Sequence, residues 1–432
     1  MTGSIRARQR IGSSRRSCET RSTLPTRPRF RRSPERNRAA IETAAKGGGR
    51  ILLLGALLLL PAAAWAQAGP RTDTPRAGQL RVTFQPVITT WEREFTDDGH
   101  ELPIGASLFS ETHPPLLCTT VKGFRTCRYD FTRVFVRAEK RVTPLAFDFG
   151  ITNRIAVGVY VPLVRVNTRA GYQLDSLGKP GAPAAAKRLD SILTDTTYAL
   201  EPVVGTSRRR HFFPGDVEVN AKYRVLELRN YALSGAVVVR LPTGHQDSPN
   251  NLFDLSTGDH QTDIELQVAQ ELTLFDRLWL NVLVRGARQQ PGTRERRVGP
   301  QSVLLIPHAA LATLNWDPGD YAAIDVAPML RLSKAFAVGF TAGYWTQQRD
   351  RYTYRSPQDS IDVATGLGTP VSAGVLDAGT ALRWTRLGVS MTYAGADVEG
   401  SFSIEQTVSG SGGRVPVATV FRIVMRTSRW PF

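Results

Sequence analysis

Residues 263–289 read DIELQVAQELTL, then FDR, then LWLNVLVRGARQ. Apolar and polar residues alternate on both sides of the central triplet Phe275-Asp276-Arg277. Because alternate residues of a β-strand point to opposite faces of its sheet, this pattern predicts two strands that each have an apolar and a polar face. The triplet is short enough for a tight connection. The segment therefore predicts an antiparallel β-hairpin.

Short connections of this kind recur along the chain, and longer polar connections separate the hairpins. The other short connections are predicted at Thr152-Asn153-Arg154, Leu228-Arg229-Asn230, Leu332-Ser333-Lys334 and Trp384-Thr385-Arg386. Outer-membrane barrels are built in this way, with short periplasmic turns and long external loops. The pattern predicts twelve strands, with both chain ends on the periplasmic side, at approximately 79–90, 132–151, 155–167, 215–227, 231–242, 261–274, 278–289, 320–331, 336–347, 374–383, 387–395 and 415–430.

Two all-β architectures fit this alternation. A soluble sandwich buries its apolar faces, whereas a membrane barrel turns them outward. The predicted strands run roughly 9–12 residues, which is enough for a tilted strand to cross a bilayer. A spanning sheet must also close on itself, because lipid cannot satisfy an open edge. The sequence favours a transmembrane antiparallel up-and-down β-barrel of about 12 strands over residues 67–432, with long external loops and short periplasmic turns.

The residues before this region predict an export signal. Residues 1–45 are rich in arginine and poor in large apolar residues, which predicts a disordered basic extension, and a misplaced start codon would explain its length. Residues 46–66 hold an apolar run and end in Ala64-Trp65-Ala66, a pattern that signal peptidase recognises. Cleavage is predicted between Ala66 and Gln67. The alternative is a membrane anchor, but the apolar run is shorter than the ~20 residues of a spanning helix.

The charge of the chain is concentrated in this leader. The whole chain carries 55 Lys and Arg against 38 Asp and Glu, a net charge of +17. Residues 1–66 contain 14 of the basic and three of the acidic residues, so the remainder keeps 41 and 35, a net charge of +6. Nucleic-acid binding requires a basic patch on a folded domain. The predicted mature chain therefore gives little support for a nucleic-acid partner.

Two cysteines follow the predicted cleavage site. Cys118 and Cys127 lie in one predicted external loop, and a compartment beyond the inner membrane permits disulfides. A metal site is the alternative, but there is no C-x-x-C spacing, and His113 alone does not complete a tetrahedral set. The sequence predicts a Cys118–Cys127 disulfide and no metal ion.

In a barrel, the polar face of each strand would line the lumen. Rings of opposite charge in a water-filled pore select solutes by charge and dipole. The alternative is a lumen closed by ion pairs among the same residues, with Glu265 and Arg285 as candidate partners, or by an inward fold of loop 169–210. The predicted lumen-lining residues are Asp216, Glu218, Lys222, Arg224, Arg240, Asp263, Glu265, Glu271, Arg285, Asp325, Arg331, Arg383, Arg422 and Arg426.

An enzyme is the remaining class to weigh, because some barrels of this size hydrolyse lipids with a serine and a histidine. The chain has no G-x-S-x-G motif, and most of its six histidines fall in predicted loops. His245 and His260 flank one loop, where histidines are usually solvated. The sequence predicts no catalytic residues and no cofactor.

Four stretches, in order along the chain, resemble a bacterial outer-membrane family labelled MetA-pathway of phenol degradation. They are Phe149–Pro162, Gly215–Arg224, Arg240–Gly244 and Thr262–Leu266. The resemblance implies a barrel in the outer membrane of a Gram-negative bacterium and, by the family label, passage of aromatic compounds. It supplies no catalytic residues.

Together these observations predict a channel for passive diffusion of small solutes, with aromatic compounds as one candidate class. The alternatives are a non-conducting structural or surface-binding barrel and, behind it, a barrel hydrolase. The predicted partners are outer-membrane lipid, small solutes and the barrel assembly machinery, which reads a terminal aromatic residue such as Phe432. Trp430 shares the parity of Phe432, whereas Phe421 and Ile423 alternate on the other parity, so a bulge at Pro431 is predicted.

Overall fold

The fold is known from a computed structural model. It describes residues 71–106, 117–121, 124–128, 131–175, 190–202, 212–300, 303–395 and 398–431. The predicted basic extension, signal peptide and cleavage site at Ala66 and Gln67 lie outside the described residues, as does Phe432. No helix among the described residues is long and apolar enough to span a membrane.

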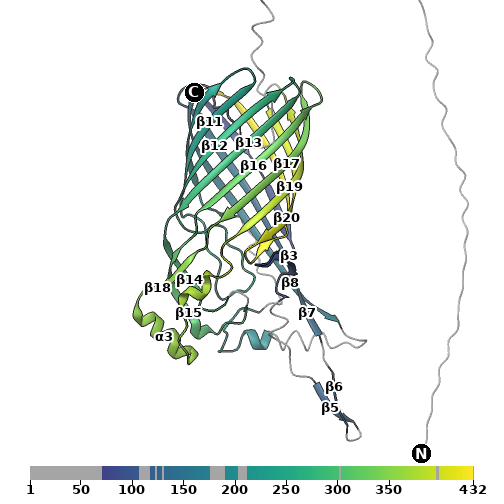
Figure 1. Ribbon diagram of the computed structural model, residues 1–432, viewed down its shortest axis with the longest axis vertical. Helices are drawn as coiled ribbons and strands as arrows, with labels where there is room; N and C mark the ends of the chain where they lie inside the picture. The colour runs from purple at the N-terminus through teal and green to yellow at the C-terminus, as the bar shows by residue number, and fades with distance from the viewer. Residues whose placement is uncertain are drawn as a thin grey trace, which may run out of the picture. The chain divides into compact units, whose positions relative to one another are not determined.

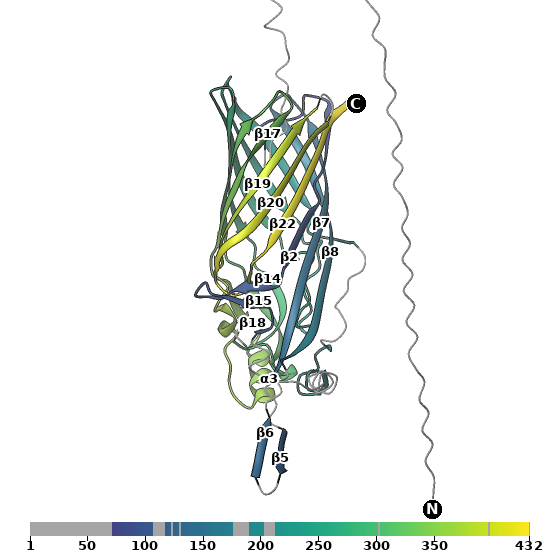
Figure 2. The same cartoon turned by 90° about the vertical axis from the view of Figure 1, so that its right-hand side faces the viewer.

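Twelve antiparallel strands form one closed barrel in this part of the chain (Figures 1 and 2). The first is split into β1 (Gln79–Phe84) and β2 (Val87–Trp91), because Pro86 has no N–H to continue the ladder. Both pieces pair with β22 on one side and β7 on the other, which closes the barrel. The remaining strands are β7 (Phe131–Gly150), β8 (Ile155–Asp175), β10 (Glu218–Glu227), β11 (Tyr231–Arg240), β12 (Asp263–Leu274), β13 (Leu278–Gln289), β16 (Tyr321–Arg331), β17 (Phe336–Gln347), β19 (Arg383–Ala394), β20 (Val398–Ser411) and β22 (Thr419–Pro431).

The two faces of each strand differ in the sense expected of a membrane barrel. In β12, Asp263 and Glu265 are 1% and 5% exposed, whereas Ile264 and Leu266 are 43% and 61% exposed. Buried and exposed residues also alternate in much of β13 and β16, and half-buried and exposed residues alternate in most of β10. A soluble sandwich would bury the apolar residues instead. The predicted all-β barrel with an apolar exterior is therefore confirmed.

Four of the five predicted short connections are confirmed. The connections at 152–154, 228–230, 275–277 and 332–334 each join two neighbouring strands at one end of the barrel (Figure 1). Phe275 and Asp276 both have positive φ, at 53° and 55°. Two consecutive residues in this region form the tight turn that matches the twist of a hairpin.

The fifth predicted connection is wrong. Trp384-Thr385-Arg386 lies inside β19, where it pairs with both β17 and β20. The predicted strand 374–383 is also wrong, because Ala373–Asp377 forms the short 3-10 helix η3 and the next strand begins at Arg383. The strand that was missed is β20, whose sequence VEGSFSIEQTVSGS has few large apolar residues. The predicted count of twelve strands is still correct, because the predicted strand 374–383 does not form and the unpredicted strand β20 does.

The phase change near the C-terminus lies within β22. Leu80 pairs with Trp430, and Val82, two residues later, pairs with Thr427. Three residues of β22 thus lie opposite two residues of β1, which is a bulge. The bulge lies between Thr427 and Trp430 and not at the predicted position, Pro431.

The long connections gather at the opposite end of the barrel (Figures 1 and 2). Here β14 (Gly292–Arg297), β15 (Leu311–Asp317) and β18 (Arg351–Tyr354) form a small sheet, against which α3 (Pro357–Leu367) packs around Leu314 and Val363. Ser356 and Asp359 form a capping box at the start of α3. Two shorter groups complete this end: β3 (Arg93–Phe95) with β4 (Glu101–Pro103) and β21 (Val415–Pro416), and the hairpin of β5 (Leu117–Val121) and β6 (Phe124–Arg128).

Candidate functional site

Two polar cavities in the barrel interior are lined by described residues. The larger is about 360 Å³ and is walled by side chains of β13, β16, β17, β19, β20 and β22. The smaller is about 210 Å³ and is walled by β1, β7, β8, β10, β11 and β12 together with Arg71. Gln85, Gln267 and Arg426 line both cavities. The two cavities therefore meet at these side chains.

Ion pairs connect neighbouring strands across this interior. Arg240 lies between Glu218 at 3.0 Å and Asp263 at 2.8 Å. The predicted pairing of Glu265 with Arg285 is wrong. Arg285 binds Asp325 at 2.9 Å, whereas Glu265 accepts hydrogen bonds from the Tyr321 hydroxyl and from Gln267.

Other predicted lumen residues have more local roles. The carboxylate of Asp216 accepts hydrogen bonds from the backbone N–H groups of Gly244 and Asp259, both at 2.7 Å, and so anchors the connection after β11. Arg224 pairs with Glu227 at 2.6 Å near the short-turn end. The guanidinium of Arg331 lies 5.5 Å from the ring centre of Trp279.

Arg383 does not face the cavities. It is exposed and shares its strand face with the exposed residues Leu387 and Val389. The predicted turn at 384–386 would place Arg383 on a different strand from Leu387 and Val389. Conversely, Arg386, which falls in the predicted turn, and Glu405, which lies on the unpredicted strand β20, both line the larger cavity. The polar alternation Ser401, Ser403, Glu405, Thr407 is the signal that marks this face of β20.

The segment Arg71–Ala77 enters the barrel at its short-turn end. Arg71 forms ion pairs with Asp73 at 3.0 Å and with Glu399 of β20, and its carbonyl accepts a hydrogen bond from Lys222 of β10. The N–H of Thr72 donates to Glu271 of β12 at 2.7 Å. Because β10, β12 and β20 belong to different sides of the barrel, the segment crosses its interior.

Further contacts fix the same segment, which we call the N-terminal segment, to the wall and to a turn. Asp73 pairs with Arg81 of β1 at 2.7 Å. The hydroxyl of Thr74 donates to the carbonyl of Asn153, and the N–H of Ala77 donates to the Asn153 side chain. The sequence suggests loop 169–210 as the segment that could fold inward and carries no signal for residues 71–77. None of the described residues of that loop lines either interior cavity.

Two larger cavities lie among the long connections, with volumes of about 450 and 610 Å³. In the first, Asp247 pairs with Arg294 at 2.5 Å and with Arg296 at 2.6 Å. Burial alone would raise the pKa of the Asp247 carboxyl, but these two guanidinium groups hold it well below its usual range. The second cavity has a more apolar wall that includes Phe95, Ile104, Phe253 and Leu304.

No metal centre emerges from the described residues, because no group of three or more His, Cys, Asp or Glu side chains there is arranged to hold an ion. The backbones of Cys118 and Cys127 lie directly opposite each other in the β5–β6 hairpin. The predicted disulfide therefore stays a prediction with compatible backbone register.

No protein-family model and no curated protein matches the chain. Among solved structures, it is similar to an outer membrane channel from Pseudomonas putida F1, with 10% identity over 84% of this chain and 100% of that chain and a TM-score of 0.49. It is also similar to the NanC porin, with 9% identity over 70% and 99% and a TM-score of 0.34. A third, the CymD monoaromatic hydrocarbon channel, shows 12% identity over 82% and 89% and a TM-score of 0.32. Similarity at this level does not identify a solute.

Proposed function

We propose that this chain is an outer-membrane channel of a Gram-negative bacterium through which small solutes diffuse passively. The observation that carries the proposal is the inverted barrel: large apolar residues are exposed on the outside, while charged residues surround cavities inside. A closed barrel with these faces suits a bilayer, because its outer surface matches acyl chains and no backbone edge is left open. The predicted export signal supports the same location.

The solute class proposed here is small organic molecules, including aromatic ones. The resemblance to the phenol-degradation family supports aromatic compounds, and we propose membership of that family on the four stretches that resemble it. We propose a lumen-lining role for Arg386, for Glu405 and for the predicted residues that face the interior. These predicted residues are Glu218, Lys222, Arg240, Asp263, Glu265, Glu271, Arg285, Asp325, Arg422 and Arg426. Phe432 is proposed as the residue read by the assembly machinery.

A non-conducting barrel is the second candidate, and a specific observation favours it. The N-terminal segment and several interior ion pairs occupy space through which a solute would pass. The interior cavities are also smaller than those among the long connections. In that case the long connections would carry the function as a binding surface.

Single-channel recording separates the two candidates. The mature chain, residues 67–432, is purified in detergent, checked for heat-modifiable migration as a folded barrel, and added to a planar bilayer. Discrete current steps support the channel. A protein that migrates as a folded barrel and inserts into vesicles, but gives no current steps, supports the non-conducting barrel.

A further inference from the structure

One side of the barrel interior carries an excess of arginine. The larger cavity is lined by Arg285 of β13, Arg386 of β19, and Arg422 and Arg426 of β22. The carboxylates that line it are Asp325 and Glu405. Arg426 also lines the smaller cavity and is within electrostatic reach of the carboxylates of Asp73 and Glu399. The other three guanidinium groups face two carboxylates, which leaves a formal charge of +1 in an enclosed polar space. Because water is restricted there, this charge acts on a solute more strongly than it would at an open surface.

The ion pairs in this cavity leave some N–H donors of the guanidinium groups without an acceptor. Arg386 at 3.3 Å and Arg422 at 3.7 Å share the single carboxylate of Glu405, and Arg285 reaches Asp325 through one terminal nitrogen. The Nε atoms of Arg285, Arg386 and Arg422 are buried and have no hydrogen-bond partner among the described residues. Buried donors are nearly always paired, so three unpaired ones around one cavity indicate a missing acceptor.

Neutral polar groups in the same cavity show the same deficit. Asn281 is 3% exposed, and neither its amide nitrogen nor its amide oxygen has a partner among the described residues. It lies on the same face of β13 as Arg285. The hydroxyl of Thr341, on β17, lines the cavity and is also without a partner in this part of the chain. The amide of Asn281 and the hydroxyl of Thr341 are both able to donate to an anion.

We infer that this cavity, which we call the arginine station, binds the carboxylate of a small organic anion during its passage. The inference rests on the proposed channel function and names its solute class. The forked donors of a guanidinium match the two oxygens of a carboxylate. Trp384 lines the same cavity and offers apolar contact to the body of the solute. Glu405 returns to Arg386 and Arg422 when the solute leaves, which keeps binding weak enough for transport.

The binding test uses the folded mature barrel in detergent, so that it does not depend on conduction. Benzoate is titrated by calorimetry, with benzamide as the uncharged molecule of the same shape. We expect benzoate to bind and benzamide not to. Arg386→Gln should weaken benzoate binding by about tenfold, as expected when one charge-assisted hydrogen bond is lost. Arg386→Lys should weaken benzoate binding as well, because lysine keeps the positive charge but lacks the paired N–H donors of a guanidinium.

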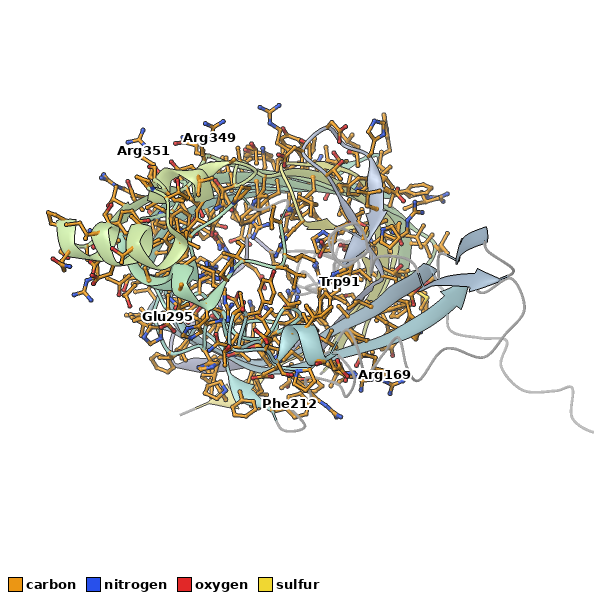
Figure 3. The ribbon with its side chains drawn as sticks, turned by 90° about the horizontal axis from the view of Figure 1, so that it is seen from below. Trp91, Arg169, Phe212, Glu295, Arg349 and Arg351 are labelled. Carbon is orange, nitrogen blue, oxygen red and sulfur yellow. The ribbon has the colours of Figure 1, made fainter. Side chains whose placement is uncertain are left out.

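A matched control removes one arginine elsewhere. Arg351 lies at the outer rim of the long-loop end and projects away from the barrel centre (Figure 3). Arg351→Gln lowers the net charge by the same amount as Arg386→Gln and should leave benzoate binding unchanged. Heat-modifiable migration of each variant establishes that it is folded. A folded Asn281→Leu variant should also bind benzoate more weakly.

Single-channel recording of the same proteins separates the two proposals. Benzoate binding that depends on Arg386, without current steps, keeps the arginine station and rejects the channel. Two results would overturn the arginine station while current steps still support the channel. One is equal affinity for benzoate and benzamide. The other is equal benzoate affinity in the wild type and in folded Arg386→Gln.

Discussion

At the residue scale, Phe340 shows why the outside of this barrel suits lipid. Its side chain is 68% exposed on β17, next to Val389 of β19 across the strand pair, which is itself exposed. In water, leaving a phenylalanine side chain exposed forgoes about 1.5–3 kcal/mol of burial free energy. A band of such residues around a closed sheet is therefore expected only where acyl chains take the place of water.

Replacing Phe340 by arginine tests this environment. If the residue faces acyl chains, Phe340→Arg should destabilise the barrel by about 2–4 kcal/mol, with the larger values toward the bilayer midplane. If it faces water, the change should lie within about 0.5 kcal/mol. Urea unfolding in lipid vesicles measures the difference. Phe275, 91% exposed in a short turn, provides the control, because Phe275→Arg should be nearly neutral in either case.

Asp247 predicts a pH dependence of the long-loop end. Arg294 and Arg296 lower its pKa when the chain is folded, so the carboxylate stabilises the fold above the ordinary aspartate pKa of about 3.9. This stabilisation should be lost as pH falls below that value. Trp316 reports the change by fluorescence, because Arg294 lies 4.8 Å from its ring centre.

The matched variant for this residue is Asp247→Asn. It should weaken the long-loop end by about 1–3 kcal/mol at pH 7, the usual effect of losing a charged hydrogen-bond partner. It should also remove the acid-dependent part of the Trp316 signal, which Trp316→Phe identifies among the other tryptophans. An unchanged acid transition in Asp247→Asn would contradict the assignment to this carboxylate.

At the scale of the element, the bounds of a strand are predicted best where its apolar and polar residues alternate most clearly. The strands β10 to β13 match the predicted bounds to within a few residues, because apolar and polar residues alternate in β10, β12 and β13 and a short turn joins each of the two hairpins. The strand β20 was missed because glycine, serine and threonine fill many of its positions. The polar residues Thr385 and Arg386 suggest a turn at 384–386, although in a barrel a polar or charged residue faces the interior without ending the strand.

The β5–β6 hairpin predicts a disulfide at this scale. Cys118 and Cys127 lie directly opposite each other in its register, and residues opposite in an antiparallel pair bring their Cβ atoms to about 4.5–5.5 Å. We expect the exported protein to resist thiol alkylation until it is reduced. Peptide mass mapping should then find the two cysteines linked, and Cys127→Ser should leave one alkylatable thiol. Two free thiols in exported, unreduced protein would rule the bond out.

At the scale of the whole molecule, the interior depends on contacts that no local pattern encodes. The charges of β10, β12 and β13 were recognisable as one polar face, but their partners were not. Arg240 of β11 forms ion pairs with residues of β10 and β12, and Glu405 forms ion pairs with arginines of β19 and β22. The N-terminal segment has no period of its own, and its role arises only because barrel closure brings Lys222, Glu271 and Glu399 around it.

The position of the N-terminal segment predicts that it narrows the channel at the short-turn end. Deleting residues 67–77 should raise single-channel conductance, because it empties the interior between β10, β12 and β20 while leaving every strand in place. Equal conductance in the deletion and the wild type would show that solutes pass without meeting this segment.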